Sequence, residues 1–170
     1  MTAERFSSEL HALMTRSTDA RQLLAWALGW LAVSVRFKGG AIARLNAADE
    51  LEIVAAFGQI DEAARNVKLR RGEGIAGNVV ATGRTIYSPD LDRPAPVGAA
   101  AASRTVGTNR LIRSYLCAPL KTQDRVIGVM QIDSERPDAF DPDDVALFES
   151  VAQTLSVSGA LAGWLSMIDG

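Results

Sequence analysis

Two apolar segments late in the chain, Leu111–Leu120 and Val126–Ser134, are separated by a short polar turn over Thr122–Arg125. This arrangement predicts an antiparallel β-hairpin. Side chains alternate between the two faces of a strand, so each strand divides into two sets. We expect the more polar sets to face away from packed helices, because a buried polar side chain needs a partner. These sets are Arg113, Tyr115 and Cys117 on the first strand and Val129, Gln131 and Asp133 on the second.

Helical patterns occupy the two ends of the chain, and short apolar segments lie between them. Cap residues, apolar periodicity and glycine or proline breaks define their boundaries. Asp90–Arg110 is an irregular stretch rich in small residues, and so long a loop in a compact domain is a candidate lid over a site. The predicted elements are helices over Glu4–Met14, Ala20–Arg36, Ile75–Ala81 and from Pro142 to Ile168, with strands over Ile42–Leu45, Leu51–Phe57 and Thr85–Ser88.

Composition excludes several classes of protein. The 18 Lys and Arg residues against 20 Asp and Glu residues give a net charge of −2, so no nucleic-acid partner is expected. One cysteine, Cys117, and one histidine, His11, allow neither a disulfide framework nor a cysteine-cluster metal site. The acidic run Asp141–Asp144 fits the start of a helix without further assumptions, so no metal is expected.

The sequence indicates neither a secretory signal nor a membrane span. Charged side chains are scattered through the first residues, unlike a signal peptide. The uncharged segment Ser150–Ile168 approaches the length of a span, but polar residues such as Gln153, Thr154 and Ser158 interrupt it. We therefore expect a cytoplasmic protein with no membrane partner, in which this segment forms a buried or dimer-forming helix.

Four motifs resemble those of GAF domains, a family of small-molecule-sensing domains. They are Arg71–Gly77 with Thr82-Gly83 and Ser88–Asp90, then Arg113–Leu120, then Val126–Ile132, and finally Phe140 with Asp144. The resemblance implies an α+β fold with a central antiparallel sheet. It places the terminal helices on one face of the sheet and a pocket, covered by a loop and a short helix, on the other. It also divides the chain into an N-terminal helical extension, residues 1–19, and one GAF-like domain, residues 20–168.

The resemblance implies that a small molecule binds between the sheet and the lid. Arg113 stands out because a guanidinium group binds a carboxylate or phosphate in a bidentate manner; the alternative is an exposed arginine at the sheet edge. Cys117 is typical of a small buried hydrophobic residue, whereas a redox role would need a lowered pKa. The sequence names no ligand and no cofactor. The predicted ligand-binding residues are Tyr87, Asp90, Arg113, Tyr115, Cys117, Val129, Gln131 and Asp133.

The enzymatic branch of the family is the free methionine-R-sulfoxide reductases, and Gly128–Ser134 is similar to their strand. Their chemistry needs a thiolate and a resolving cysteine. The resemblance would place these thiols at Ala76 and in the lid, but residue 76 is alanine and Asp90–Arg110 contains no cysteine. We therefore predict a non-enzymatic sensory or regulatory domain with no catalytic residue. A degenerate reductase and a ligand-free dimerisation module are the alternatives.

The terminal helices carry more apolar surface than one sheet face needs. Small residues, Gly159 and Gly163, would also let two helices approach closely. A homodimer through a helical bundle is expected, unless the surplus stripe is covered within one chain. No kinase, cyclase or DNA-binding pattern occurs, so any output partner is expected on another chain. The predicted interface residues are Leu24, Leu28, Leu31, Leu147, Val151, Leu161 and Leu165.

Overall fold

The computed structural model describes residues 2–58, 68–93, 112–123 and 125–166 of the chain. Its helices are α1 (Ala3–Met14), α2 (Ala20–Ser34), α4 (Gly74–Thr82), α5 (Pro142–Val157) and α6 (Gly159–Ser166). Its strands are β1 (Gly39–Leu45), β2 (Glu50–Gly58), β3 (Leu69–Arg70), β4 (Ile86–Ser88), β5 (Ser114–Thr122) and β6 (Arg125–Ser134).

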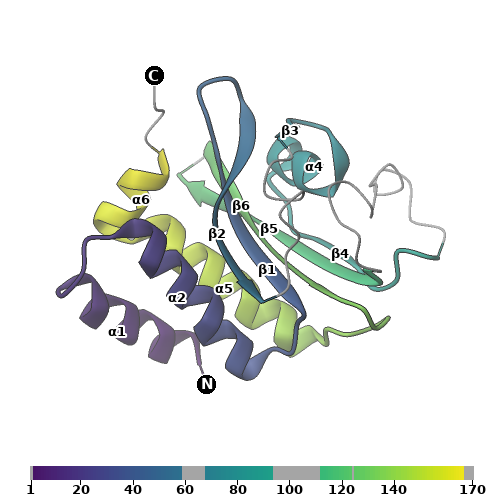
Figure 1. The fold of residues 1–170 in the computed structure, drawn as a ribbon, viewed down its shortest axis with the longest axis horizontal. Helices are drawn as coiled ribbons and strands as arrows, with labels where there is room; N and C mark the ends of the chain where they lie inside the picture. The colour runs from purple at the N-terminus through teal and green to yellow at the C-terminus, as the bar shows by residue number, and fades with distance from the viewer. Residues whose placement is uncertain (1, 59–67, 94–111, 124, 167–170) are drawn as a thin grey trace.

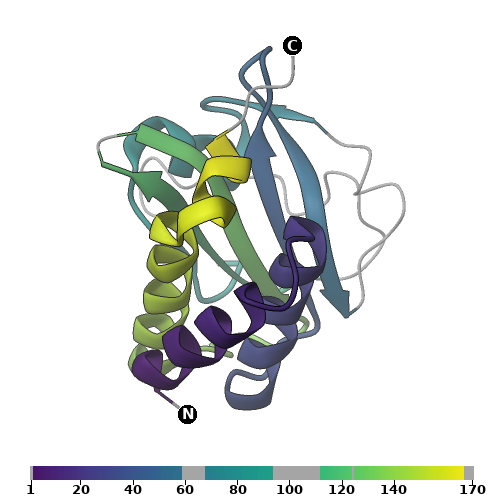
Figure 2. The same ribbon diagram turned by 90° about the vertical axis from the view of Figure 1, so that its left-hand side faces the viewer.

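The strands form one antiparallel sheet in the order β3-β2-β1-β6-β5-β4. The terminal helices cover one face of this sheet, and α4 lies over the other (Figures 1 and 2). This is the α+β layering that the sequence predicts. Most of the predicted lid, residues 94–110, lies outside the described residues.

The starts of α2 and α5 follow the expected capping chemistry. The Asp19 side chain accepts a hydrogen bond from the backbone of Gln22 at the start of α2. At the start of α5, Asp141 accepts from the Asp144 amide at 2.8 Å, and Asp144 accepts from the Asp141 amide at 3.0 Å. This reciprocal pair satisfies backbone donors that a helix start leaves without partners. The capping interpretation of the acidic run is confirmed.

The last helix is not continuous as predicted. It ends at Val157, and Gly159 has a φ of +39°, so the chain changes direction before α6 begins. A positive φ favours glycine. The α6 helix then lies beside the sheet, where the Trp164 ring faces the Arg44 guanidinium 4.3 Å from the ring centroid. None of the helices in the described ranges is both long and apolar enough to cross a bilayer.

The larger hydrophobic core lies between the sheet and the terminal helices. Helix α1 contributes Phe6 and Leu10, both fully buried, so residues 1–19 include part of the same core. The predicted dimer-interface residues Leu24, Leu28, Leu31, Val151, Leu161 and Leu165 are also buried in this core within one chain.

The predicted interface is therefore wrong for these six residues. The surplus apolar stripe is covered by the chain itself, because α1 packs against α2 and α5 and because α6 turns back towards the sheet. Leu147 is half-buried and packs at the margin of the same core. A homodimer stays a prediction, but it would have to use other side chains.

A smaller core lies on the opposite face, beneath α4. Ile75, Ala76, Val79 and Val80 of α4 pack there against side chains of β1, β5 and β6. Gly77 permits this packing, because a Cβ atom at that position would overlap the carbonyl oxygen of Arg70 and lie 3.0 Å from the Gly72 nitrogen. The glycines of the Arg71–Gly77 segment thus allow the chain before α4 to pass close to the helix.

Candidate functional site

The α4 face of the sheet carries the polar side chains of the β5–β6 hairpin. Tyr115 and Cys117 on β5 lie opposite Asp133 and Gln131 on β6, and directly opposed residues share a face. Cys117 and Val129 belong to the core beneath α4, with Tyr115 at its margin. The alternate residues Leu116, Ala118, Met130 and Ile132 belong to the core beneath the terminal helices. The predicted division of the hairpin into two faces is confirmed.

Tyr115 and Gln131 form a hydrogen-bonded pair on the α4 face. The Tyr115 hydroxyl donates to Oε1 of Gln131. Burial, followed by the nearby Cys117 and Asp133, raises the pKa of Tyr115 well above its usual value. Tyr115 therefore stays protonated at physiological pH. The pair is a polar position at the margin of an otherwise apolar core, which suits the recognition of a small molecule.

Asp90 and Arg113 form a bidentate ion pair at the end of this face. The Arg113 Nε and Nη2 atoms donate to the two Asp90 carboxylate oxygens at 2.9 and 2.8 Å. A second carboxylate, that of Asp92, lies 3.0 Å from Nε. Arg113 precedes β5 rather than lying within it, and its backbone amide donates to Ser134. The Arg113 guanidinium that the sequence offered to a ligand is thus engaged by carboxylates of its own chain.

Tyr87 lies on the other face of the sheet from the predicted pocket. It pairs with Leu116 across the β4–β5 ladder and therefore shares the face of the terminal helices. Its hydroxyl accepts a hydrogen bond from the Phe140 amide at 3.1 Å, and the two rings pack with centroids 5.9 Å apart. The placement of Tyr87 in the α4-face pocket is wrong, because the β4–β5 register sets its face. Ile86 takes the α4 side instead.

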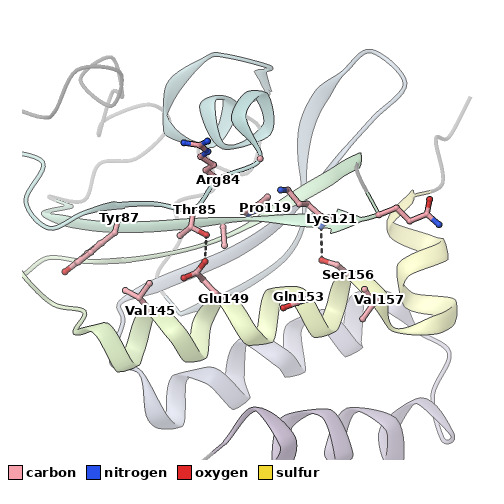
Figure 3. A pocket seen from close by; sticks show the side chains of 13 residues that line it. Arg84, Thr85, Tyr87, Pro119, Lys121, Val145, Glu149, Gln153, Ser156 and Val157 are labelled. Carbon is pink, nitrogen blue, oxygen red and sulfur yellow. Dashed lines mark hydrogen bonds between the residues drawn. The ribbon is translucent and has the colours of Figure 1, made fainter.

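A groove of about 740 Å³ runs along α5 at the β4–β5 edge of the sheet (Figure 3). Sequence reasoning did not identify it. One sequence pattern does indicate its α5 wall. Residues four apart lie on the same face of a helix, and the wall consists of Val145, Glu149, Gln153 and Val157. The remaining lining residues are Gly83, Arg84, Thr85, Tyr87, Ala118, Pro119, Lys121, Gln123 and Ser156.

Comparison with protein families matches residues 9–158 to the model of the GAF domain. The chain belongs to the GAF domain family. The matched region of this GAF domain begins inside α1 and ends just after α5.

The GAF domain is similar to the Nif-specific regulatory proteins of Azospirillum lipoferum and Azospirillum brasilense. Each is 30% identical to it over 154 residues. The alignment covers 86% of this chain but 24% of each relative, so the chain spans about a quarter of their length.

Two solved structures show the same fold at low sequence identity. The GAF domain of the Acinetobacter phosphoenolpyruvate-protein phosphotransferase has a TM-score of 0.76 at 17% identity, covering 98% of this chain and 94% of that one. A free methionine-R-sulfoxide reductase of Neisseria meningitidis, solved with its substrate, has a TM-score of 0.72 at 22% identity. The alignment with this reductase covers 96% of this chain and 89% of the reductase chain.

Cys117 of the GAF domain should be unreactive in the folded protein. The side chain is fully buried, and burial raises the pKa of its thiol, so the reactive thiolate is disfavoured. We expect no measurable reaction with a thiol reagent at pH 8 during the time in which urea-unfolded protein reacts completely. Rapid modification of the native protein would contradict this burial.

Proposed function

We propose that this GAF domain is a non-enzymatic sensory domain. It binds a small molecule on the α4 face of the sheet and signals through the terminal helices. The single observation that carries the proposal is the two-faced β5–β6 hairpin. Its polar Tyr115–Gln131 pair lies on the α4 face, and its apolar residues lie against the terminal helices. The regulatory names of the Azospirillum relatives support the same role.

The hairpin supplies a physical route from ligand to helices. Tyr115 and Leu116 are neighbours on β5, as are Gln131 and Ile132 on β6, and each pair points to opposite faces. A ligand that binds one hairpin geometry more tightly shifts the population towards it. The displaced apolar side chains then change their packing against α5, which contacts β5 extensively.

The chemistry of the chain supports a role without catalysis. It holds one cysteine, so two of its own thiols cannot form the disulfide that regenerates a sulfoxide-reducing site. The low-identity likeness to sulfoxide reductases concerns the fold. Incubation with free methionine sulfoxide and a thiol reductant separates the two functions. We expect no loss of sulfoxide above a protein-free control.

Output is proposed to come from a different domain or chain in the cytoplasm. The Azospirillum relatives are about four times longer than the aligned region, which supports association of such a domain with other regulatory parts. The ligand of the α4 face is proposed to be an acidic or polar metabolite, since the Tyr115 hydroxyl and the Gln131 amide can hydrogen-bond polar groups.

Native mass spectrometry of protein purified gently from its own host tests ligand binding. We expect a retained mass on the wild type and its loss in the double variant Y115F/Q131L. Replacing both hydrogen-bonding partners by apolar groups of similar shape leaves no unsatisfied donor, so folding should be nearly unaffected. The control is Q22L, which removes an exposed amide on α2, away from the α4 face. A ligand kept equally by all three proteins would overturn the assignment of this face.

A further inference from the structure

The groove along α5 is lined by neither Tyr115 nor Gln131, the polar pair of the α4 face. Its wall residues Tyr87 and Ala118 lie on the terminal-helix side of the sheet, opposite Tyr115 and Gln131. Its volume of about 740 Å³ falls within the range of small-molecule sites, roughly 300–1,000 Å³. In Figure 3, Arg84 and Lys121 extend from one side of the strands, and the α5 side chains Glu149 and Gln153 approach from the other.

The groove follows an edge of the sheet that is closed to another strand. β4 pairs with residues 115–117 of β5, so β5 continues beyond it from Ala118. Pro119 has no amide hydrogen to donate, and the Lys121 amide donates to Ser156 Oγ of α5 at 3.0 Å. These two features prevent strand addition along this part of β5. An occupant of the groove is therefore held by side chains rather than by backbone pairing.

Two cationic side chains, Arg84 and Lys121, line the groove at this edge. Extension of the β4–β5 register places Arg84 next to Pro119, and the Lys121 Nζ atom lies 2.9 Å from where a Cβ of Gly83 would be. The left-handed Gly83, with a φ of +66°, thus makes room for the ammonium group beside Arg84. Neither cation forms an ion pair with any residue that the structure describes.

The one carboxylate among the lining residues is already engaged. Glu149 Oε2 accepts a hydrogen bond from the Thr85 hydroxyl at 3.0 Å (Figure 3). The lining residues therefore carry two positive charges against one negative charge. A bound anion would offset this excess of positive charge. Pro119, half-buried and next to Arg84 in the extended register, supplies an apolar surface beside this cation.

We propose that this groove binds a small organic anion, a carboxylate or a phosphate monoester. Its acidic group lies between Arg84 and Lys121, and its apolar part lies against Pro119. Arg84 offers a planar fork that matches either acidic group, and Lys121 supplies a compact second charge. Ser156, Gln153 and Glu149 of α5 line the opposite wall of the same groove.

Isothermal titration with three probes tests the proposal at low ionic strength, where exposed charges are least screened. The probes are inorganic phosphate, phenyl phosphate and benzoate. We expect phenyl phosphate to bind more tightly than inorganic phosphate, because its ring buries apolar surface. Benzoate binding comparable to that of phenyl phosphate would assign a carboxylate ligand, and weaker binding a phosphate ester.

The variant R84Q/K121Q should weaken phenyl phosphate binding at least about tenfold, which is what loss of one charge-assisted hydrogen bond produces. The matched control R36Q/K38Q removes two exposed charges at another place, with no described partner for either side chain, and should bind as the wild type does. The variant Y115F/Q131L should also bind normally, which separates this groove from the α4-face pocket.

Three results would overturn the proposal. One is the absence of phenyl phosphate binding to the wild type, which would leave Lys121 as a cation placed at the C-terminal end of α4. Another is equal weakening by R84Q/K121Q and R36Q/K38Q, which would indicate attraction to net charge alone. The third is loss of binding in Y115F/Q131L with no effect of R84Q/K121Q, which would assign the probe to the α4 face.

Discussion

Replacement of Gly128 by alanine should reduce the free energy of unfolding by about 3 kcal/mol. This value is the upper end of the usual cost of inserting extra atoms into a well-packed interior. Gly128 lies in the central strand β6 between Arg44 of β1 and Leu120 of β5. An added Cβ would overlap the Ala43 carbonyl oxygen and lie 3.0 Å from the Arg44 Cα. Both atoms belong to the β1 backbone, so relief requires the β1–β6 ladder to open. Urea denaturation measures the effect.

The matched control for this substitution is G163A. Gly163 lies in α6 with open space around its Cβ position, and alanine favours a helix over glycine by about 1 kcal/mol. We expect G163A to be as stable as the wild type or slightly more stable. A G128A protein within about 0.5 kcal/mol of the wild type, the range of ordinary surface changes, would show that the strands separate more easily than the structure indicates.

Replacement of Phe148 by alanine should reduce the free energy of unfolding by about 3–5 kcal/mol. The ring is fully buried in the core that joins α5 to the sheet, α1 and α2. Its removal loses the transfer free energy of the ring and leaves a cavity that the surrounding helices fill incompletely. Thermal and urea unfolding, followed by circular dichroism, measure the loss.

The neighbouring substitution L147A serves as the control. Leu147 lies one position away on α5 and is half-buried. Its truncation therefore removes less buried apolar surface than the truncation of Phe148 does. The loss should be clearly smaller than that of F148A. Equal losses would contradict the assignment of Phe148 to the core and Leu147 to its margin.

The two-faced hairpin was predictable because strand alternation is a local property of the backbone. Tyr115, Cys117 and Gln131 could be assigned to one face from their positions alone, and the structure confirms that face. The start of α5 was predictable for the same reason, since Asp141, Pro142 and Asp144 act on backbone groups a few residues away.

Tyr87 shows where such local reasoning fails. Its face depends on the register of β4 against β5, which joins residues about 30 positions apart in the sequence, and a one-residue difference reverses the face. The end of the last helix is a related case. Its apolar periodicity continues past Ser158, but Trp164 packs beside Arg44 only because Gly159 redirects the chain.

The assignment of apolar stripes to a dimer fails for a similar reason. Leu24 and Val151 have the same helical periodicity whether a second chain or α1 of the same chain covers them. A local pattern indicates only the α5 wall of the groove beside Arg84 and Lys121, because its other walls come from β5 and the segment before β4.

The sequence by itself determined the caps of α2 and α5, the β5–β6 hairpin and the side-chain alternation of its strands, because these depend on neighbours within a few residues. Tertiary structure alone decided which surfaces meet: the face of Tyr87, the covering of the terminal helices and the placement of Arg84 and Lys121 along one groove. Such contacts join residues far apart in the chain. Their geometry follows from the packing of the whole domain, which short-range periodicity does not contain.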